Sequence, residues 1–107
     1  METLDAILKS KRELAGQYID FFANQNIQCV GELQNSQVNY WLNAIILKDK
    51  EERDLFLKET NDNGVMTRPI WALMNKLDMF KECQCAGLPN ALWLEERVVN
   101  IPSGVRL

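Results

Sequence analysis

The chain has 107 residues, 47% of them hydrophobic and 25% charged, with a net charge of −3 and no histidine. This composition indicates one globular domain with a modest core, argues against nucleic acid or an anionic membrane as a partner, and excludes catalysis or metal binding by histidine. We expect reduced thiols at Cys29, Cys83 and Cys85, no metal site and no disulfide framework, and a cytoplasmic protein, because no apolar run could span a bilayer and the N-terminus lacks signal-peptide features.

The first half of the chain predicts a helix, a loop, a strand and a second helix. Apolar residues recur at helical spacing over residues 4–22, and Thr3 can cap this helix. A polar loop over residues 24–37 follows, with a short extended piece at residues 27–30. Residues 38–47 are apolar on both alternating faces, which indicates a central strand or one that is covered on both sides.

Helix start and stop signals bound the next element, a helix from residue 50 to about residue 61. Asp49 begins a capping box of the D-x-x-E kind ahead of it. Leu55 and Phe56 form its apolar side, which we expect to be buried. Gly64 ends the helix in a left-handed conformation.

The second half is interrupted more often by proline and glycine. It predicts a strand at residues 65–68 stopped by Pro69, a short helix at 72–79, a loop at 81–87, a helix at 89–98 and a short extended exit at 100–104. So small a sheet does not need parallel crossovers. The whole chain, residues 1–107, therefore predicts a single α+β domain, with a sheet of two to four strands and helices packed mainly on one face.

Four segments in a defined order and spacing carry a resemblance. They are Asn39-Tyr-Trp-Leu-Asn43, Thr67-Arg-Pro-Ile-Trp71, Leu77-Asp-Met-Phe80 and Asn90-Ala-Leu-Trp-Leu-Glu-Glu-Arg-Val-Val-Asn-Ile-Pro-Ser103. Together they resemble the C-terminal region of DegT-type sugar aminotransferases, which are pyridoxal-phosphate enzymes of fold type I. The similarity is greatest to the branch that aminates a nucleotide-linked 4-keto-6-deoxy sugar, as in the legionaminic acid pathway. The resemblance spans most of the chain and implies the small C-terminal domain of such an enzyme.

The resemblance also implies what the chain lacks. In this family a large domain carries the Schiff-base lysine and the aspartate that faces the pyridine nitrogen, and nothing here resembles either segment. The lysines of this chain lie on polar faces or turns, whereas a Schiff-base lysine needs a desolvated or charge-lowered site. We therefore expect an excised or truncated C-terminal domain that binds no cofactor and performs no catalysis by itself. Its implied partners are the large pyridoxal-phosphate domain, the sugar nucleotide, an amino donor such as glutamate, and a second copy in a homodimer.

Arg68 and Trp71 are the candidate substrate-binding residues. A guanidinium makes planar two-point contacts with a carboxylate or a phosphate, and the implied reaction supplies both, in glutamate and in the sugar diphosphate. Trp71 can form an apolar wall for a sugar or a base. The structural alternatives are a surface ion pair for Arg68 and core packing for Trp71. Related aminotransferases often carry histidine where Ile70 stands, so no polar role carries over to that position.

Other conspicuous residues are interpreted as structural. Core positions are expected for Tyr40, Trp41, Met66, Met74, Leu77 and Met79. The Glu95-Glu96-Arg97 run is expected on a solvated face, because adjacent helical positions point about 100° apart and their carboxylates do not converge. Trp93 is expected to be exposed, toward the large domain. The first helix is apolar over more than one stripe, which predicts an exposed patch that meets the large domain or a second copy.

A second function remains open from the sequence: a stand-alone α+β module that binds a small anion or a protein. Both functions use the same basic and aromatic edge, around Arg68 and Trp71. A large pyridoxal-phosphate domain encoded next to this chain would favour the aminotransferase, and its absence would favour the module.

Overall fold

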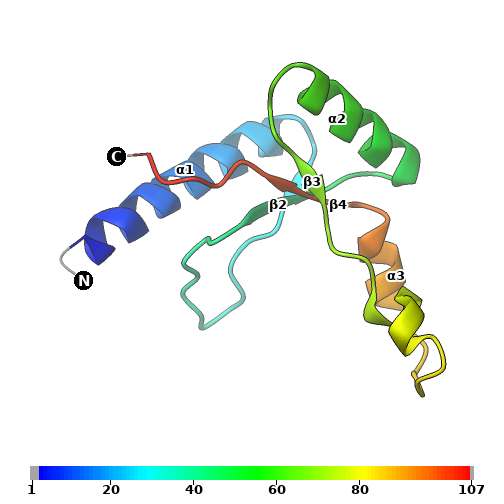
Figure 1. The fold of residues 1–107 in the computed structure, drawn as a ribbon. Coiled ribbons are helices and arrows are strands. Elements are labelled where there is room, and N and C mark those ends of the chain that lie inside the picture. The colour runs from blue at the N-terminus through cyan, green and yellow to red at the C-terminus, as the bar shows by residue number, and fades with distance from the viewer. Residues whose placement is uncertain (1–2, 107) are drawn as a thin grey trace.

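The computed structural model describes residues 3–106, which form helices around a small antiparallel sheet. The elements in chain order are α1 (Leu4–Asn24), β1 (Gln28–Cys29), β2 (Asn43–Ile46), α2 (Lys50–Asp62), β3 (Arg68–Pro69), the 3₁₀ turns η1 (Met74–Lys76) and η2 (Asp78–Phe80), α3 (Pro89–Glu95) and β4 (Val98–Ile101) (Figure 1). The strand order is β1-β2-β4-β3, and every pairing is antiparallel. The predicted α+β class is therefore confirmed. Among the described residues, no helix is both long and apolar enough to cross a membrane.

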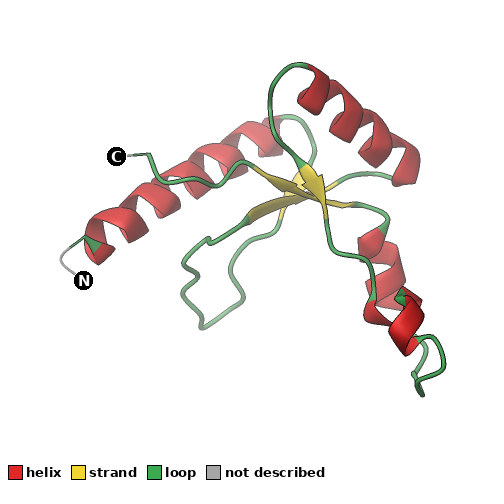
Figure 2. Cartoon of the chain, in the orientation of Figure 1, coloured by secondary structure: helices red, strands yellow, loops and turns green. Residues whose placement is uncertain are grey.

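The core lies between one face of the sheet and the helices α1 and α2 (Figure 2). Its buried members are Phe22, Ile45, Leu47, Val99 and Ile101. Ile45 pairs with Val99 across the two central strands, and both side chains are fully buried, while Phe56 packs against them from α2. On the far face, Ala44 and Ile46 are only half-buried. Helices therefore pack mainly on one face, as expected. Strand β2 is an inner strand of the sheet, which confirms its predicted central position, and its second face is only partly covered.

Strand β2 is shorter than the predicted strand at residues 38–47, because residues 38–42 form a loop. Tyr40 has a φ of 51°, in the left-handed region that strand residues do not adopt. The Trp41 N–H donates to Asn39 Oδ1 at 3.0 Å, a local bond that competes with strand pairing. Trp41 is 68% exposed and Tyr40 is half-buried, so the expected core position is wrong for Trp41.

The C-terminal strands differ most from the predicted elements. The helix predicted over residues 89–98 ends at Glu95, and Val98 begins β4. This central strand takes the place of the end of that helix and the start of the predicted extended exit. Strand β3 contains Pro69, which the sequence predicts to stop it. The Ile70 N–H donates to Val98 O at 3.3 Å. Because bonding directions alternate along an antiparallel strand, the nitrogen of Pro69 faces the open edge of the sheet, where no donor is needed.

Both ends of α2 follow their local signals. Asp49 Oδ1 accepts the Glu52 N–H at 2.8 Å, so the predicted N-terminal cap is confirmed. Gly64 has a φ of 81°, and the Val65 N–H donates to Thr60 O at 2.8 Å. This pattern is the Schellman closure of a helix C-terminus, which confirms the predicted end.

Three other local expectations are wrong. Thr3 makes no side-chain bond to the start of α1. Leu55 is 55% exposed, because Phe56 and Leu57 occupy the face of α2 that meets the core. The helix predicted at residues 72–79 is replaced by the 3₁₀ turns η1 and η2, which an extended Leu77 separates. The segment between β3 and α3 is therefore less regular than its apolar spacing suggests.

The molecule is extended for its size. Its radius of gyration is 15.9 Å, whereas a compact domain of this length has a radius of about 13 Å. Its accessible surface is 8297 Å², against about 6,100 Å² for a compact monomer of 12.4 kDa. The excess of about 2,200 Å² is surface that an ordinary monomer of this mass would bury.

Candidate functional site

Thr67 anchors the segment that carries the candidate residues. It is 2% exposed, and its Oγ1 lies 2.6 Å from Thr60 Oγ1 and accepts a bond from Asn61 Nδ2 at 3.0 Å. Both partners belong to the last turns of α2, so the start of β3 is fixed to the end of that helix. Arg68 follows directly and pairs with Asn100 of β4. Because successive residues of an extended chain point to opposite sides, Thr67 faces α2 and Arg68 starts from the far face.

Arg68 is exposed on the edge strand of the sheet, as the sequence predicts. Its Nη1 donates to Asn61 Oδ1 at 3.3 Å and to Thr67 O at 3.0 Å. Both acceptors are neutral, and within residues 3–106 the ion pairs do not include Arg68. The surface ion pair considered from the sequence is therefore not what this residue makes. A guanidinium has five N–H donors, so this arrangement leaves capacity for a planar anion.

Trp71 lies beyond the end of β3 and is 67% exposed, so it is not a core residue. Met66, which precedes Arg68, is equally exposed. The structure brings Arg68 and Trp71 to one exposed stretch of chain, but no hydrogen bond or stacking contact joins them within residues 3–106. The cation–π contact of this part of the chain belongs to Arg97, whose guanidinium carbon lies 4.4 Å from the centre of the Trp93 ring.

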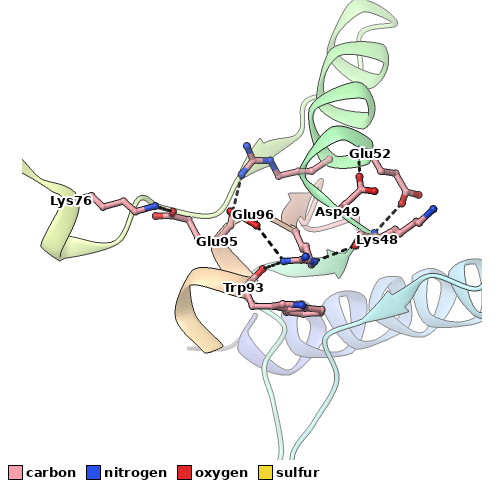
Figure 3. Close-up of polar contacts among 9 residues, drawn as sticks. Lys48, Asp49, Glu52, Lys76, Trp93, Glu95 and Glu96 are labelled. Carbon is pink, nitrogen blue, oxygen red and sulfur yellow. Dashed lines mark hydrogen bonds and ion pairs between the residues drawn. The ribbon is translucent and has the colours of Figure 1, made fainter. Parts of the chain in front are cut away.

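Glu95 connects the Trp71 segment to α3 (Figure 3). Its Oε2 accepts the Leu73 N–H at 2.6 Å, and its Oε1 forms an ion pair with Lys76 Nζ. Hydrogen bonds from Lys76 and from the Leu73 N–H lower the pKa of the Glu95 carboxyl. The charged carboxylate therefore bridges the segment that leaves β3 and the helix that leads into β4.

Two arginines fasten α3 to the start of α2. Arg53 Nη1 donates to Glu95 O at 2.8 Å. Arg97 Nε donates to Lys48 O at 3.2 Å, and its Nη1 donates to Trp93 O at 2.9 Å. The side chains of Glu95 and Arg97 are only 13% and 18% exposed, so the expected solvated face is wrong for these two residues. Trp93 is exposed, as expected, but it also carries the stacked arginine.

The segment after Trp71 presents apolar side chains at the surface. Leu73 is one of the residues around a cavity of about 300 Å³, which is also lined by Met74, Asn75, Phe80, Cys83, Gln84, Cys85 and Leu88. The core positions expected from the sequence are wrong for Met66, Met74, Leu77 and Met79, all of which are exposed. For Met74, Leu77 and Met79 the exposure follows from the 3₁₀ turns η1 and η2, which protrude from the sheet instead of packing on it (Figure 1). Met66 lies in the loop just before β3.

The residues of this chain do not fit covalent attachment of pyridoxal phosphate. Carboxylates form ion pairs with Lys9, Lys58, Lys76 and Lys81. Lys48 and Lys50 are exposed, and the half-buried Lys11 donates to Ser103 O at 2.8 Å. None of these settings is the desolvated or cation-neighboured site that activates a Schiff-base lysine. Within residues 3–106, no cluster of three or more histidine, cysteine or acidic residues could hold a metal ion.

Comparison with known proteins gives one consistent result. The model of the DegT/DnrJ/EryC1/StrS aminotransferase family matches residues 1–107. The GDP-perosamine synthase of Vibrio cholerae is 28% identical over an alignment of 106 residues, and the match covers 96% of this chain and 29% of that protein.

Two solved structures have the same fold as this chain. The aminotransferase TlmJ from Streptoalloteichus hindustanus matches with a TM-score of 0.82 and 20% identity, over 94% of this chain and 27% of its own. The sugar aminotransferase CalS13 from Micromonospora echinospora matches with a TM-score of 0.82 and 22% identity, over 96% of this chain and 27% of its own. The chain thus spans less than a third of the length of each of these relatives.

Proposed function

Because the chain belongs to the DegT/DnrJ/EryC1/StrS aminotransferase family, we propose that it is the C-terminal domain of a pyridoxal-phosphate-dependent sugar aminotransferase. In this proposal the enzyme moves an amino group from an amino acid, with glutamate the first candidate, to a nucleotide-linked 4-keto-6-deoxy sugar. The observation that carries the proposal is a family match over the whole chain. The names of two relatives, a GDP-perosamine synthase and a sugar aminotransferase, support a sugar substrate.

In this role the chain shapes the substrate site and leaves the cofactor to another part of the enzyme. Pyridoxal phosphate supplies the electron sink for amino transfer, and a lysine outside this chain holds it. Arg68 contributes an exposed guanidinium with neutral neighbours, which suits a carboxylate of the donor or a diphosphate of the sugar nucleotide. Trp71 contributes an exposed apolar surface for a sugar ring or a base.

The extended shape supports a covering partner. The excess surface of about 2,200 Å² is comparable with what permanent interfaces bury. On α1, Leu4, Ile19 and Phe21 are exposed apolar residues on this surface. We therefore assign these exposed apolar residues of α1 to contacts with the large pyridoxal-phosphate domain or with a second copy in a homodimer.

Two measurements on the purified chain test whether it binds the cofactor covalently or transfers an amino group by itself. After addition of pyridoxal phosphate, we expect no imine absorbance that borohydride fixes to one lysine. We also expect no transfer of an amino group from glutamate to a 4-keto-6-deoxy sugar nucleotide. Stoichiometric labelling of a single lysine, or measurable transfer, would show that the chain holds the cofactor chemistry itself.

The coding sequence around the chain tests the assignment to a larger enzyme. We expect a preceding large domain with a Schiff-base lysine, and we expect the product of the complete reading frame to catalyse the transfer. A reading frame without such a domain would leave the stand-alone binding module as the function.

A further inference from the structure

We propose that Glu95 is a positioning residue, whose carboxylate holds Trp71 in place through the backbone of Leu73; its importance for catalysis rests on the substrate role proposed for Trp71. Within residues 3–106, the hydrogen bonds and the ion pair of the Glu95 side chain join it to Leu73 and Lys76 and not to Trp71 or Arg68. It acts on the short piece of backbone from which the indole projects. No sequence motif marks this role, because Glu95 and Leu73 are 22 residues apart.

Two backbone anchors lie on either side of Trp71. Before it, the Ile70 N–H donates to Val98 O at 3.3 Å, at the end of the ladder between β3 and β4. After it, the Leu73 N–H donates to Glu95 Oε2 at 2.6 Å. Trp71 and one further residue lie between these anchors. Because each residue adds only two soft dihedrals, so short a span restricts the backbone of Trp71 and with it the direction of the Cα–Cβ bond from which the indole projects.

Glu95 is itself held firmly enough to serve as an anchor. Its backbone oxygen accepts Arg53 Nη1 at 2.8 Å, which ties the end of α3 to α2. Its Oε1 forms an ion pair with Lys76, which leaves Oε2 directed at the Leu73 N–H. Its side chain is only 13% exposed, so little water competes for these bonds. The carboxylate therefore extends the ladder between β3 and β4 beyond the point where the backbone bonds end.

A bridge that only stabilises the chain would behave differently. Losing such a bridge lowers the free energy of unfolding, which speeds amide exchange throughout the core, including at Val99. Losing a local anchor speeds exchange at Leu73 by a larger factor than at Val99, and it changes the environment of Trp71 while the distant Trp41 reports no change. The two roles are thus separable at individual residues.

Nitrogen-15 NMR of the complete chain tests the proposal through the Leu73 amide exchange rate and the Trp71 indole signal. Glu95→Ala removes the acceptor, and we expect about tenfold faster exchange at Leu73, the lower end for a charge-assisted bond, together with a displaced Trp71 signal. Glu95→Gln combined with Lys76→Met restores a neutral acceptor of the same length without its ion-pair partner. This double variant is expected to raise the Leu73 rate only about threefold, because a neutral bond is worth roughly half as much as a charge-assisted one, and to keep the Trp71 signal in place.

Either of two results overturns the proposal. One is an unchanged Leu73 rate and Trp71 signal in Glu95→Ala, and the other is a double variant that behaves like Glu95→Ala. If Glu95→Ala does not fold, Leu73→Pro decides, because it removes the donor at a φ of −61° that proline adopts. A displaced Trp71 signal then supports the anchor, and an unmoved signal refutes it. Neither readout involves pyridoxal phosphate or a sugar nucleotide, so this inference and the proposed function can fail separately.

Discussion

Replacing Thr67 by valine removes one buried hydroxyl and keeps the size and branching of the side chain. That hydroxyl lies 2.6 Å from Thr60 Oγ1 and accepts Asn61 Nδ2 at 3.0 Å. After the change, Thr60 keeps its bond to Phe56 O and Asn61 keeps its bond to Leu57 O, both at 2.7 Å. Neither partner is left without a bond, so the loss is that of one or two net hydrogen bonds and not the larger cost of an orphaned group.

We therefore expect Thr67→Val to lower the free energy of unfolding by about 1–2 kcal/mol. In a domain of about this length, that corresponds to a fall in Tm of roughly 5–15 °C. Urea denaturation measures the effect, with a lower midpoint and an unchanged m value, because the surface exposed on unfolding stays the same.

A double-mutant cycle with Thr60→Val isolates the bond between the two hydroxyls. Because each single variant already breaks that bond, the two losses should add to more than the loss in the double variant, with a coupling of at least about 0.5 kcal/mol. An unchanged urea midpoint in Thr67→Val, or strictly additive losses, would refute the argument that this buried contact ties β3 to α2.

Three further predictions concern other parts of the chain. Gly64→Ala should lower the free energy of unfolding by about 1 kcal/mol in a urea assay, because a φ of 81° strains a side chain even though nothing lies within 4 Å of an added Cβ. Gly16→Ala is the matched control: it lies at an open position within α1 and should stabilise the chain in the same assay. Bonds from Lys76 and a backbone N–H lower the pKa of Glu95. The contribution of Glu95 to the free energy of unfolding should therefore be complete above its ordinary pKa of 4.5 and lost as pH falls through the lower pKa of the folded state. Urea denaturation at a series of pH values should show this loss in wild type and not in Glu95→Gln with Lys76→Met. In the complete aminotransferase, Arg68→Lys should lower kcat/KM by the equivalent of roughly 1.5–3 kcal/mol and change the free energy of unfolding by less than about 0.5 kcal/mol, and wild-type kinetics would mark Arg68 as structural.

Sequence reasoning succeeded where a signal and its partner lie within a few residues. The Asp49 side chain caps an N–H three residues later, and Gly64 closes the same helix from just beyond its end. Arg68 was predicted at an exposed edge because a guanidinium that binds an anion must be accessible, and it lies exposed on the edge strand β3. The backbone bends at Tyr40 because Asn39 offers a local bond, a signal present in the sequence but outweighed by the apolar run around it.

Sequence reasoning failed where the partner is distant. Val98 could continue the helix before it or pair with Ile46 in a strand. The pairing with a distant strand decides between the two, and the local propensity of Val98 does not. The anchor at Glu95 was missed for the same reason, since its contacts to Leu73 and Arg53 span 22 and 42 residues. Long-range pairing, which leaves no periodic trace in one sequence, determines both the central strand and the part of the candidate site that positions Trp71.

The position of β4 in the sheet has a consequence for how the chain folds during synthesis. Of the described elements it is synthesised last, yet it lies between β2 and β3 and pairs with both. Until residue 101 has been added, the sheet can contain only the β1–β2 pair, and two strands alone are marginal in water. The apolar sides of α1 and α2 therefore stay exposed during synthesis, which makes the nascent chain prone to aggregation. The four-stranded sheet can therefore form only after β4, one of its inner strands, has been made.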